Sequence, residues 1–164
     1  MEEGHDVRRL KNMVGSFISN EEARDSVLRD IEELLKYKRM FKMVEEFQEA
    51  FEPKGYKPQL RYDLLKEELN EYLDASEIGD EVEVADALVD MMYILIGTIN
   101  KAGIRTVFYS LFREVHESNM SKLGEDGKPL RNENGKVIKG PNYRRPDLAP
   151  ILDRMKRRLK EAEK

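Results

Sequence analysis

The stretch that decides the fold runs from Val82 to Ile99 and reads Val-Glu-Val-Ala-Asp-Ala-Leu-Val-Asp-Met-Met-Tyr-Ile-Leu-Ile-Gly-Thr-Ile. Its apolar residues lie nearly all the way round a helix, which predicts a helix buried in the middle of the fold. Asp86 and Asp90 interrupt this stretch one turn apart, on one face of the helix. A carboxylate in an apolar helix is unfavourable unless it is paired or binds a metal ion. We therefore expect a neighbouring element to carry a partner for these two acids.

Three glutamates lie one helix upstream, in a predicted helix over residues 60–78: Glu67, Glu68 and Glu71. Gly79 indicates a turn between the two helices, and Asp80 restarts the chain as a helix. Counted outward from Gly79, Glu71 and Asp86 lie eight and seven residues away, and Glu68 and Asp90 both lie eleven away. Equal counts mean equal height in an antiparallel helix pair. The glutamates and the aspartates should therefore meet.

Five acids at close quarters repel one another unless a cation lies between them. A hard divalent ion, Mg²⁺ with Mn²⁺ as a substitute, is the natural counterion of an all-oxygen cluster. The predicted metal ligands are Glu67, Glu68, Glu71, Asp86 and Asp90. Two simpler interpretations remain: the glutamates form a solvated helix face, or Asp90 is a buried acid paired with Arg or Lys.

Composition excludes several classes of protein. The 164 residues carry a net charge of −4, which argues against a nucleic-acid binder that relies on a basic surface. The chain has no cysteine and two histidines, too few for a disulfide framework or a usual zinc enzyme. The longest unbroken apolar run, Met91–Ile96, is far too short to cross a bilayer, and the acidic N-terminus is no signal peptide. We expect a soluble, cytoplasmic protein with no membrane partner.

The rest of the chain also predicts helices. Apolar periodicity indicates a helix over residues 6–18, and a capping box at Ser19 begins either two helices or one bent helix that ends before Pro53. Further helices are predicted over 60–78, 81–101 and 106–123, and after Asp147. Residues 124–146 have no helical period and predict a long irregular loop with a small hairpin near Asn134-Gly135.

These motifs together resemble the all-α nucleoside triphosphate pyrophosphohydrolases, a superfamily that includes MazG proteins, dimeric dUTPases and phosphoribosyl-ATP pyrophosphohydrolase. The resemblance covers about residues 41–152, and its motifs are Glu67-Glu68-x-x-Glu71, Asp86-x-x-x-Asp90, Gly103-Ile104, Glu114-Val-His-x-x-Asn119-Met-Ser-Lys122 and Lys139-Gly-Pro-Asn-Tyr-x-x-Pro-Asp. The segments from Asp90 onward look like the MazG-like dUTPase branch. The implied fold is an all-α helical bundle of this type. Residues 1–40 would be a helical extension packed on a domain over 41–164, within one structural domain.

One motif departs from the family pattern. The usual second motif is Glu-x-x-Asp, and with Asp90 as its aspartate the glutamate position holds Ala87. Either Asp86 replaces that glutamate, or Glu83-x-x-Asp86 is the true motif. The equal-height count favours Asp86 with Asp90.

The resemblance implies Mg²⁺-dependent hydrolysis between the α and β phosphates of a nucleotide, which yields a monophosphate and pyrophosphate. It makes dUTP or another dNTP the first choice of substrate, phosphoribosyl-ATP the alternative enzymatic substrate, and a homodimer or dimer of dimers the expected assembly. A non-enzymatic helical interaction module is the competing class.

The resemblance also implies roles for single residues. Glu68 would be a metal ligand or the general base. Lys122 and Lys139 would neutralise phosphates, with hydrogen-bonding support from Asn119, Asn142 and Tyr143. Arg144 and Arg145 are left open between solvent and phosphate contact.

Overall fold

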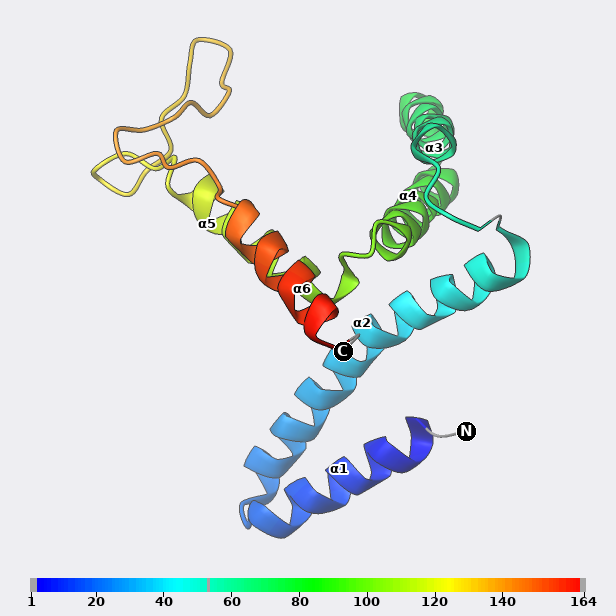
Figure 1. The fold of residues 1–164 in the computed structure, drawn as a ribbon. Coiled ribbons are helices and arrows are strands. Elements are labelled where there is room, and N and C mark those ends of the chain that lie inside the picture. The colour runs from blue at the N-terminus through cyan, green and yellow to red at the C-terminus, as the bar shows by residue number, and fades with distance from the viewer. Residues whose placement is uncertain (1–2, 53, 163–164) are drawn as a thin grey trace. The chain divides into compact units, whose positions relative to one another are not determined.

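The computed structural model describes the backbone of residues 3–52 and 54–162, and their side chains except those of residues 3–8, 11 and 34. Within these ranges it is all-α, as predicted. Its elements are α1 (Glu3–Phe17), α2 (Glu21–Phe51), α3 (Pro58–Ile78), α4 (Glu81–Lys101), the 3₁₀ turn η1 (Arg105–Val107), α5 (Phe108–Met120) and α6 (Ala149–Ala162). The chain divides into two compact units, residues 1–97 and 98–164, which are described separately below (Figure 1).

In the first unit, α1 folds back along the N-terminal half of α2 (Figure 1). Asn20 caps α2, because its side-chain oxygen accepts a hydrogen bond from the N–H of Ala23 at 2.9 Å. The capping box predicted at Ser19 is therefore one residue early. α2 then runs through 31 residues as a single helix. The predicted domain boundary at residue 40 lies inside this helix, and the separate extension over residues 1–40 stays a prediction.

The turn between α3 and α4 has the predicted form. Gly79 has φ = 72°, a left-handed conformation that glycine adopts without steric penalty, and it ends α3. The carboxylate of Asp80 then accepts hydrogen bonds from the N–H groups of Val82 and Glu83, at 3.1 and 3.2 Å. An acidic cap of this kind satisfies amides that have no partner within the helix. The two acid-bearing helices are thus joined by a short, well-defined turn.

The burial of α4 differs from the prediction. Ala87, Ile94, Ile96 and Gly97 are buried, but Val82 is 75% exposed and Val89 is 62% exposed. Asp86 and Asp90 are exposed as well. Within the first unit, α2 and α3 cover only one side of α4, so the expectation of a fully buried helix is wrong for the single chain.

The second unit contains the predicted loop. Residues 121–148 join α5 to α6, and β-structure among them is limited to two isolated antiparallel bridges, Leu123 with Pro129 and Arg131 with Val137. The second bridge encloses the predicted turn, where Gly135 has φ = 74°. The hairpin is therefore present in its smallest form. No described helix is long and apolar enough to cross a membrane, and the cytoplasmic location stays a prediction.

Candidate active site

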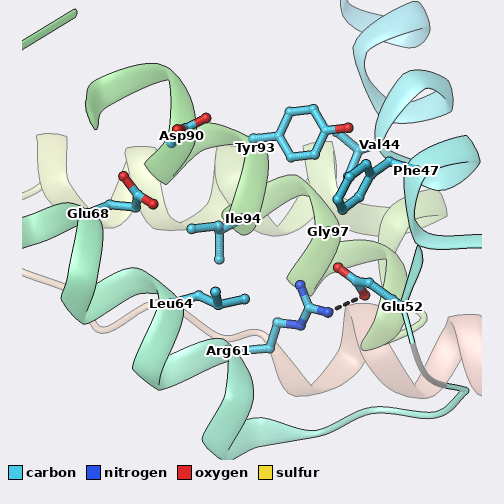
Figure 2. Close-up of a pocket in the computed structure, with 10 residues that line it drawn as sticks. All are labelled: Val44, Phe47, Glu52, Arg61, Leu64, Glu68, Asp90, Tyr93, Ile94 and Gly97. Atoms are coloured by element: carbon cyan, nitrogen blue, oxygen red, sulfur yellow. Dashed lines mark hydrogen bonds and ion pairs between the residues drawn. The ribbon is translucent and has the colours of Figure 1, made fainter. Parts of the chain in front are cut away.

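Glu68 of α3 and Asp90 of α4 face each other across the space between their helices (Figure 2). Both line a pocket of about 350 Å³ in the first unit. Glu68 Oε2 is buried and has no hydrogen-bond partner among the described residues. A buried carboxylate oxygen without a donor is unfavourable, so its position calls for a cation or a polar ligand.

The acids around Glu68 form what we call the carboxylate cluster: Glu67, Glu68, Glu71, Asp86 and Asp90. Burial raises the pKa of Glu68, and the negative charges of the other four acids raise it further. Like charges act in this way only at short range. Glu68 and Asp90 line one pocket, and the other three acids lie near enough to act electrostatically on Glu68. That all five hold one cation stays a prediction. The two acids of α4 that act on Glu68 are Asp86 and Asp90, which favours that pair over Glu83-x-x-Asp86.

The carboxylate cluster fits a hard divalent cation by its chemistry. All its donor atoms are carboxylate oxygens, the ligands that Mg²⁺ and Mn²⁺ prefer, and one of them is the unpartnered oxygen of Glu68. Across the described residues, no three Asp, Glu or His side chains converge closely enough to hold a metal ion. This spacing is expected for side chains of like charge, because mutual repulsion keeps them apart until a cation is bound.

A polar group at the other end of the pocket was not predicted from sequence. Arg61 of α3 forms an ion pair with Glu52 at the end of α2, and their side chains are only 7% and 14% exposed (Figure 2). Gln48 donates hydrogen bonds to Glu52 Oε2 at 3.1 Å and to the carbonyl of Gly97 at 3.0 Å. These contacts join α2, α3 and α4 around one end of the pocket.

Gly97 supplied a signal for this contact that sequence reasoning missed. A Cβ atom at residue 97 would lie 2.8 Å from Gln48 Nε2 and 3.4 Å from Arg61 Nη1. An isolated glycine inside an apolar helix often marks such a close approach. Glu52 and Arg61, by contrast, look like ordinary surface charges in the sequence, and only the tertiary fold reveals their burial.

Aromatic side chains form one wall of the pocket. The rings of Phe47 and Tyr93 meet edge to face, with their centroids 5.6 Å apart. Burial raises the pKa of Tyr93, and the carboxylates of Glu52 and Asp90 raise it further. The pocket therefore runs from the acids Glu68 and Asp90, past apolar and aromatic walls, to the Arg61–Glu52 pair.

The predicted substrate-binding residues all lie in the second unit. Lys122 Nζ donates a hydrogen bond to Asn119 Oδ1 at 2.7 Å. The ammonium of Lys139 lies 4.4 Å from the centroid of the Tyr143 ring, a cation–π contact. Asn142 is exposed. Four of the five predicted residues thus form two pairs, Asn119 with Lys122 at the end of α5 and Lys139 with Tyr143 in the returning loop.

Comparison with known proteins identifies the family. The model of the phosphoribosyl-ATP pyrophosphohydrolase family matches residues 34–119, which is just over half of the chain. The match includes the whole carboxylate cluster and ends before Lys122. No match was found among curated proteins. The chain belongs to the phosphoribosyl-ATP pyrophosphohydrolase family, within the all-α nucleoside triphosphate pyrophosphohydrolases.

Proposed function

We propose that this member of the phosphoribosyl-ATP pyrophosphohydrolase family hydrolyses the anhydride between the α and β phosphates of phosphoribosyl-ATP or a related nucleoside triphosphate, with release of pyrophosphate. The observation that carries the proposal is the buried, unpartnered oxygen of Glu68 among four further carboxylates. A phosphoanhydride is highly charged and needs positioning and charge neutralisation more than covalent chemistry. The carboxylate cluster is suited to recruit the cation for that purpose.

Mg²⁺ is the proposed cofactor, and Mn²⁺ should substitute for it. Glu67, Glu71, Asp86 and Asp90 would hold the cation, and Glu68 would be a further ligand or the general base. When bound, the cation neutralises phosphate oxygens and makes water a better nucleophile.

Glu68 is also placed to act on a proton. Burial and neighbouring charges raise the pKa of Glu68 toward neutral pH. A general base works best there, because it is still largely ionised and also binds a proton well. The adjoining apolar and aromatic walls would keep bulk water away from that carboxylate. Phe47 and Tyr93 offer ring surfaces on which part of a nucleotide could pack.

The substrate choice follows the family match. Phosphoribosyl-ATP, the alternative in the sequence analysis, is favoured over dUTP because the matching family is described by that substrate. A second candidate, dUTP or another dNTP, is supported by the resemblance of Asn119-x-x-Lys122 and the Lys139 segment to the MazG-like dUTPase branch. Lys122 and Lys139 lie beyond the matched residues, so the family match does not speak against it.

A homodimer is proposed on the basis of exposed apolar side chains. Leu69 and Leu73 of α3 are 56% and 54% exposed, and Met92 of α4 is 51% exposed. Patches of large exposed apolar side chains usually mark an interaction site. A second copy of this chain would cover them and complete the burial of α4 that the sequence predicts. Sedimentation velocity tests this, and a monomer at micromolar concentration would contradict it.

Pyrophosphate release tests the activity. The panel contains phosphoribosyl-ATP, dUTP, the other dNTPs and the NTPs, each assayed with Mg²⁺ and with EDTA. We expect metal-dependent release from one or a few of these substrates. If the whole panel is inert and Mg²⁺ does not raise the melting temperature, the non-enzymatic interaction module replaces this proposal.

A further inference from the structure

Three pairs of residues from α3 and α4 line the pocket at matched heights. The members of each pair lie equally far along the chain from Gly79, and the pairs are Glu68 with Asp90 at 11 residues, Leu64 with Ile94 at 15 and Arg61 with Gly97 at 18. Figure 2 shows Leu64 and Ile94 between the two acids and Arg61. The acids therefore lie between the turn that joins the helices and the level of Arg61 and Gly97.

Contacts from α2 connect the two helices at that level. Arg61 of α3 forms its ion pair with Glu52 at the end of α2. Gln48 of α2 donates both to Glu52 Oε2 and to the carbonyl of Gly97 in α4. We call these four residues, Gln48, Glu52, Arg61 and Gly97, the Arg61 network. A continuous series of polar contacts thus runs from α3 through α2 to α4, and the burial of Gln48 and Arg61 keeps water from competing for it.

The ion pair in this network supplies geometry more than net stability. A buried ion pair adds little over apolar side chains of similar size, since both charges lose their hydration. Arg61 loses more than this, because its buried Nε has no hydrogen-bond partner among the described residues. Moving Arg61 away from Glu52 would leave two buried charges unpaired, so the pair strongly favours one arrangement of α2 against α3.

Gly97 sets the approach of α4 to the same point. A Cβ atom at residue 97 would lie 2.8 Å from Gln48 Nε2, the nitrogen that makes both hydrogen bonds of Gln48 in the network. A methyl group there would displace this nitrogen from its two acceptors. The separation of α4 from α2 is therefore closely set at the level of the network.

The acids themselves push α3 and α4 apart. The negative charges of four acids raise the pKa of Glu68, a sign that the acids repel one another. If the helices pivot at Gly79, an opening of about 1 Å at the Arg61 network separates Glu68 from Asp90 by about 0.6 Å, in proportion to their distance from the turn. Mg²⁺ binds oxygen ligands at about 2.1 Å with a tolerance of about 0.2 Å, so an opening of this size would weaken its binding.

We propose that the Arg61 network positions the metal site: it holds α3 and α4 at the separation at which Glu68 and Asp90 bind a divalent cation. Arg61 is thus a positioning residue, which acts on Glu68 through two turns of α3. The network opposes the repulsion between the acids before the cation arrives, so less binding energy is spent on bringing the ligands together. The inference rests on the proposed function, since the cation is the one that this function requires.

Mn²⁺ binding to the full chain tests the inference without substrate. Free Mn²⁺ is measured by electron paramagnetic resonance, at a temperature where circular dichroism shows each variant to be folded. Arg61→Ala should bind Mn²⁺ about tenfold more weakly than the wild type. Arg61→Lys should recover part of the loss, because an ammonium group can keep the ion pair with Glu52. Lys57→Ala is the matched control: it removes the same charge one turn earlier, from an exposed side chain, and should bind within about twofold of the wild type.

Gly97→Ala tests the same spacing with every charge in place. The added methyl group should displace Gln48 and weaken Mn²⁺ binding about threefold. Gly15→Ala is its control, since it also replaces a glycine within a helix, but its Cβ would meet no atom closer than Arg24 Cδ at 4.0 Å. It should bind Mn²⁺ as the wild type does. This pair of variants keeps the inference testable should Arg61→Ala fold poorly.

The melting temperature in EDTA separates positioning from stability alone. If Arg61→Ala melts earlier than the wild type but the folded variant binds Mn²⁺ equally well, the network is only structural and the inference is overturned. Unchanged Mn²⁺ affinity in Gly97→Ala, or an equal loss in Lys57→Ala, would overturn it as well. A wild-type protein that binds no Mn²⁺ would also overturn it, while the pyrophosphate-release assay would still decide the proposed function on its own.

Discussion

The carboxylate cluster of the first unit differs in how its charges are balanced from the Arg144 network of the second unit. In this network, Arg144 contacts Glu114, Glu117, Ser118 and Ser121. In the cluster, burial raises the pKa of Glu68, and the negative charges of four neighbouring acids raise it further. In the network, Arg144 lies between Glu114 and Glu117, and its hydrogen bond, together with one from the N–H of Asp147, lowers the pKa of Glu114. The acids of the carboxylate cluster thus repel one another, whereas the acids of the Arg144 network are neutralised by Arg144.

Paired opposite charges and clustered like charges have different effects in a folded protein. Opposite charges that are already paired fix a geometry, because moving one leaves the other without its partner. Like charges held together by the fold raise the energy of the site until a cation binds, and the folding of α3 and α4 supplies the energy that keeps them close. We therefore expect substitutions in the cluster to alter chemistry and metal binding, and substitutions in the loop to alter affinity and local stability.

Glu68→Gln should have the largest effect. It keeps the size of the side chain but removes its charge, so turnover should fall about 10³-fold, or about 4 kcal/mol in the activation barrier, with the fold intact. The measurement is kcat/KM for pyrophosphate release. Glu83→Gln is the matched control on the first turn of α4 and should retain near-wild-type activity. Full activity of Glu68→Gln would remove Glu68 from the mechanism.

Asp90→Asn should weaken metal binding. Loss of one charged ligand is expected to reduce Mg²⁺ affinity by about 10- to 100-fold, and so to shrink the rise in melting temperature that Mg²⁺ gives. A Mg²⁺ titration followed by thermal melting measures this. A titration curve that coincides with the wild type would mean that Asp90 has a structural role only.

Gly140→Ala should open the base of the loop. The new Cβ would clash with backbone oxygens of Lys122 and Leu123, and relief requires a backbone shift that we expect to destabilise the loop by about 2 kcal/mol. Limited proteolysis between residues 123 and 139 should quicken accordingly. Gly135→Ala is the control at the hairpin tip: it is strained by φ = 74° but meets no atom, and should cost about 1 kcal/mol. Equal proteolysis of the two variants would contradict a tight contact between Gly140 and the backbone of Lys122 and Leu123.

Lys139→Ala should affect substrate affinity. Removing one of the two lysines that the family resemblance assigns to the phosphates should raise KM for the triphosphate substrate about tenfold, while kcat changes less. Initial-rate kinetics at saturating Mg²⁺ measure it, and Lys136→Ala, within the hairpin, provides a control with the same loss of charge. Unchanged kinetics would mean that residues 124–146 do not take part in substrate binding.

The pH dependence of stability should show the smallest effect. The pKa of Glu68 is raised in the folded state, so its stabilising contribution is present below the unfolded pKa and is lost as pH rises through the folded pKa. In EDTA, the melting temperature of the wild type should thus drop by about 2 °C relative to Glu68→Gln over that range. Mg²⁺ should abolish the difference. Parallel melting curves in EDTA would contradict the raised pKa.

Glu114 should respond in the opposite direction. Its pKa is lowered, so its contribution is present above the unfolded pKa and is lost as pH falls through the folded pKa. Proteolysis of the loop should therefore quicken in acid, and Glu114→Gln should remove that acid response. A loop that is cleaved at the same rate at all pH values would show that the Arg144 network does not hold it.

Much of the local structure could be predicted from sequence because it depends on neighbours along the chain. The bounds of α4, the glycine turn at Gly79 and the cap at Asp80 follow from hydrophobic periodicity and turn chemistry within a few residues. The meeting of Glu68 in α3 with Asp90 in α4 could also be predicted, since a short turn between two antiparallel helices sets which residues lie at equal height. The Ser19 prediction missed by one residue because Ser19 and Asn20 are both good capping residues.

What the sequence by itself determined is the set of helices and the meeting of Glu68 with Asp90, because both follow from local propensity and fixed helical rise. The tertiary structure alone decided three other features: the burial of the Arg61–Glu52 pair, the exposure of one side of α4, and the attachment of Arg144 to Glu114. The two ion pairs join residues 9 and 30 positions apart along the chain, and the exposure of α4 depends on what covers its face. Such contacts arise from packing, which periodicity along one chain does not encode.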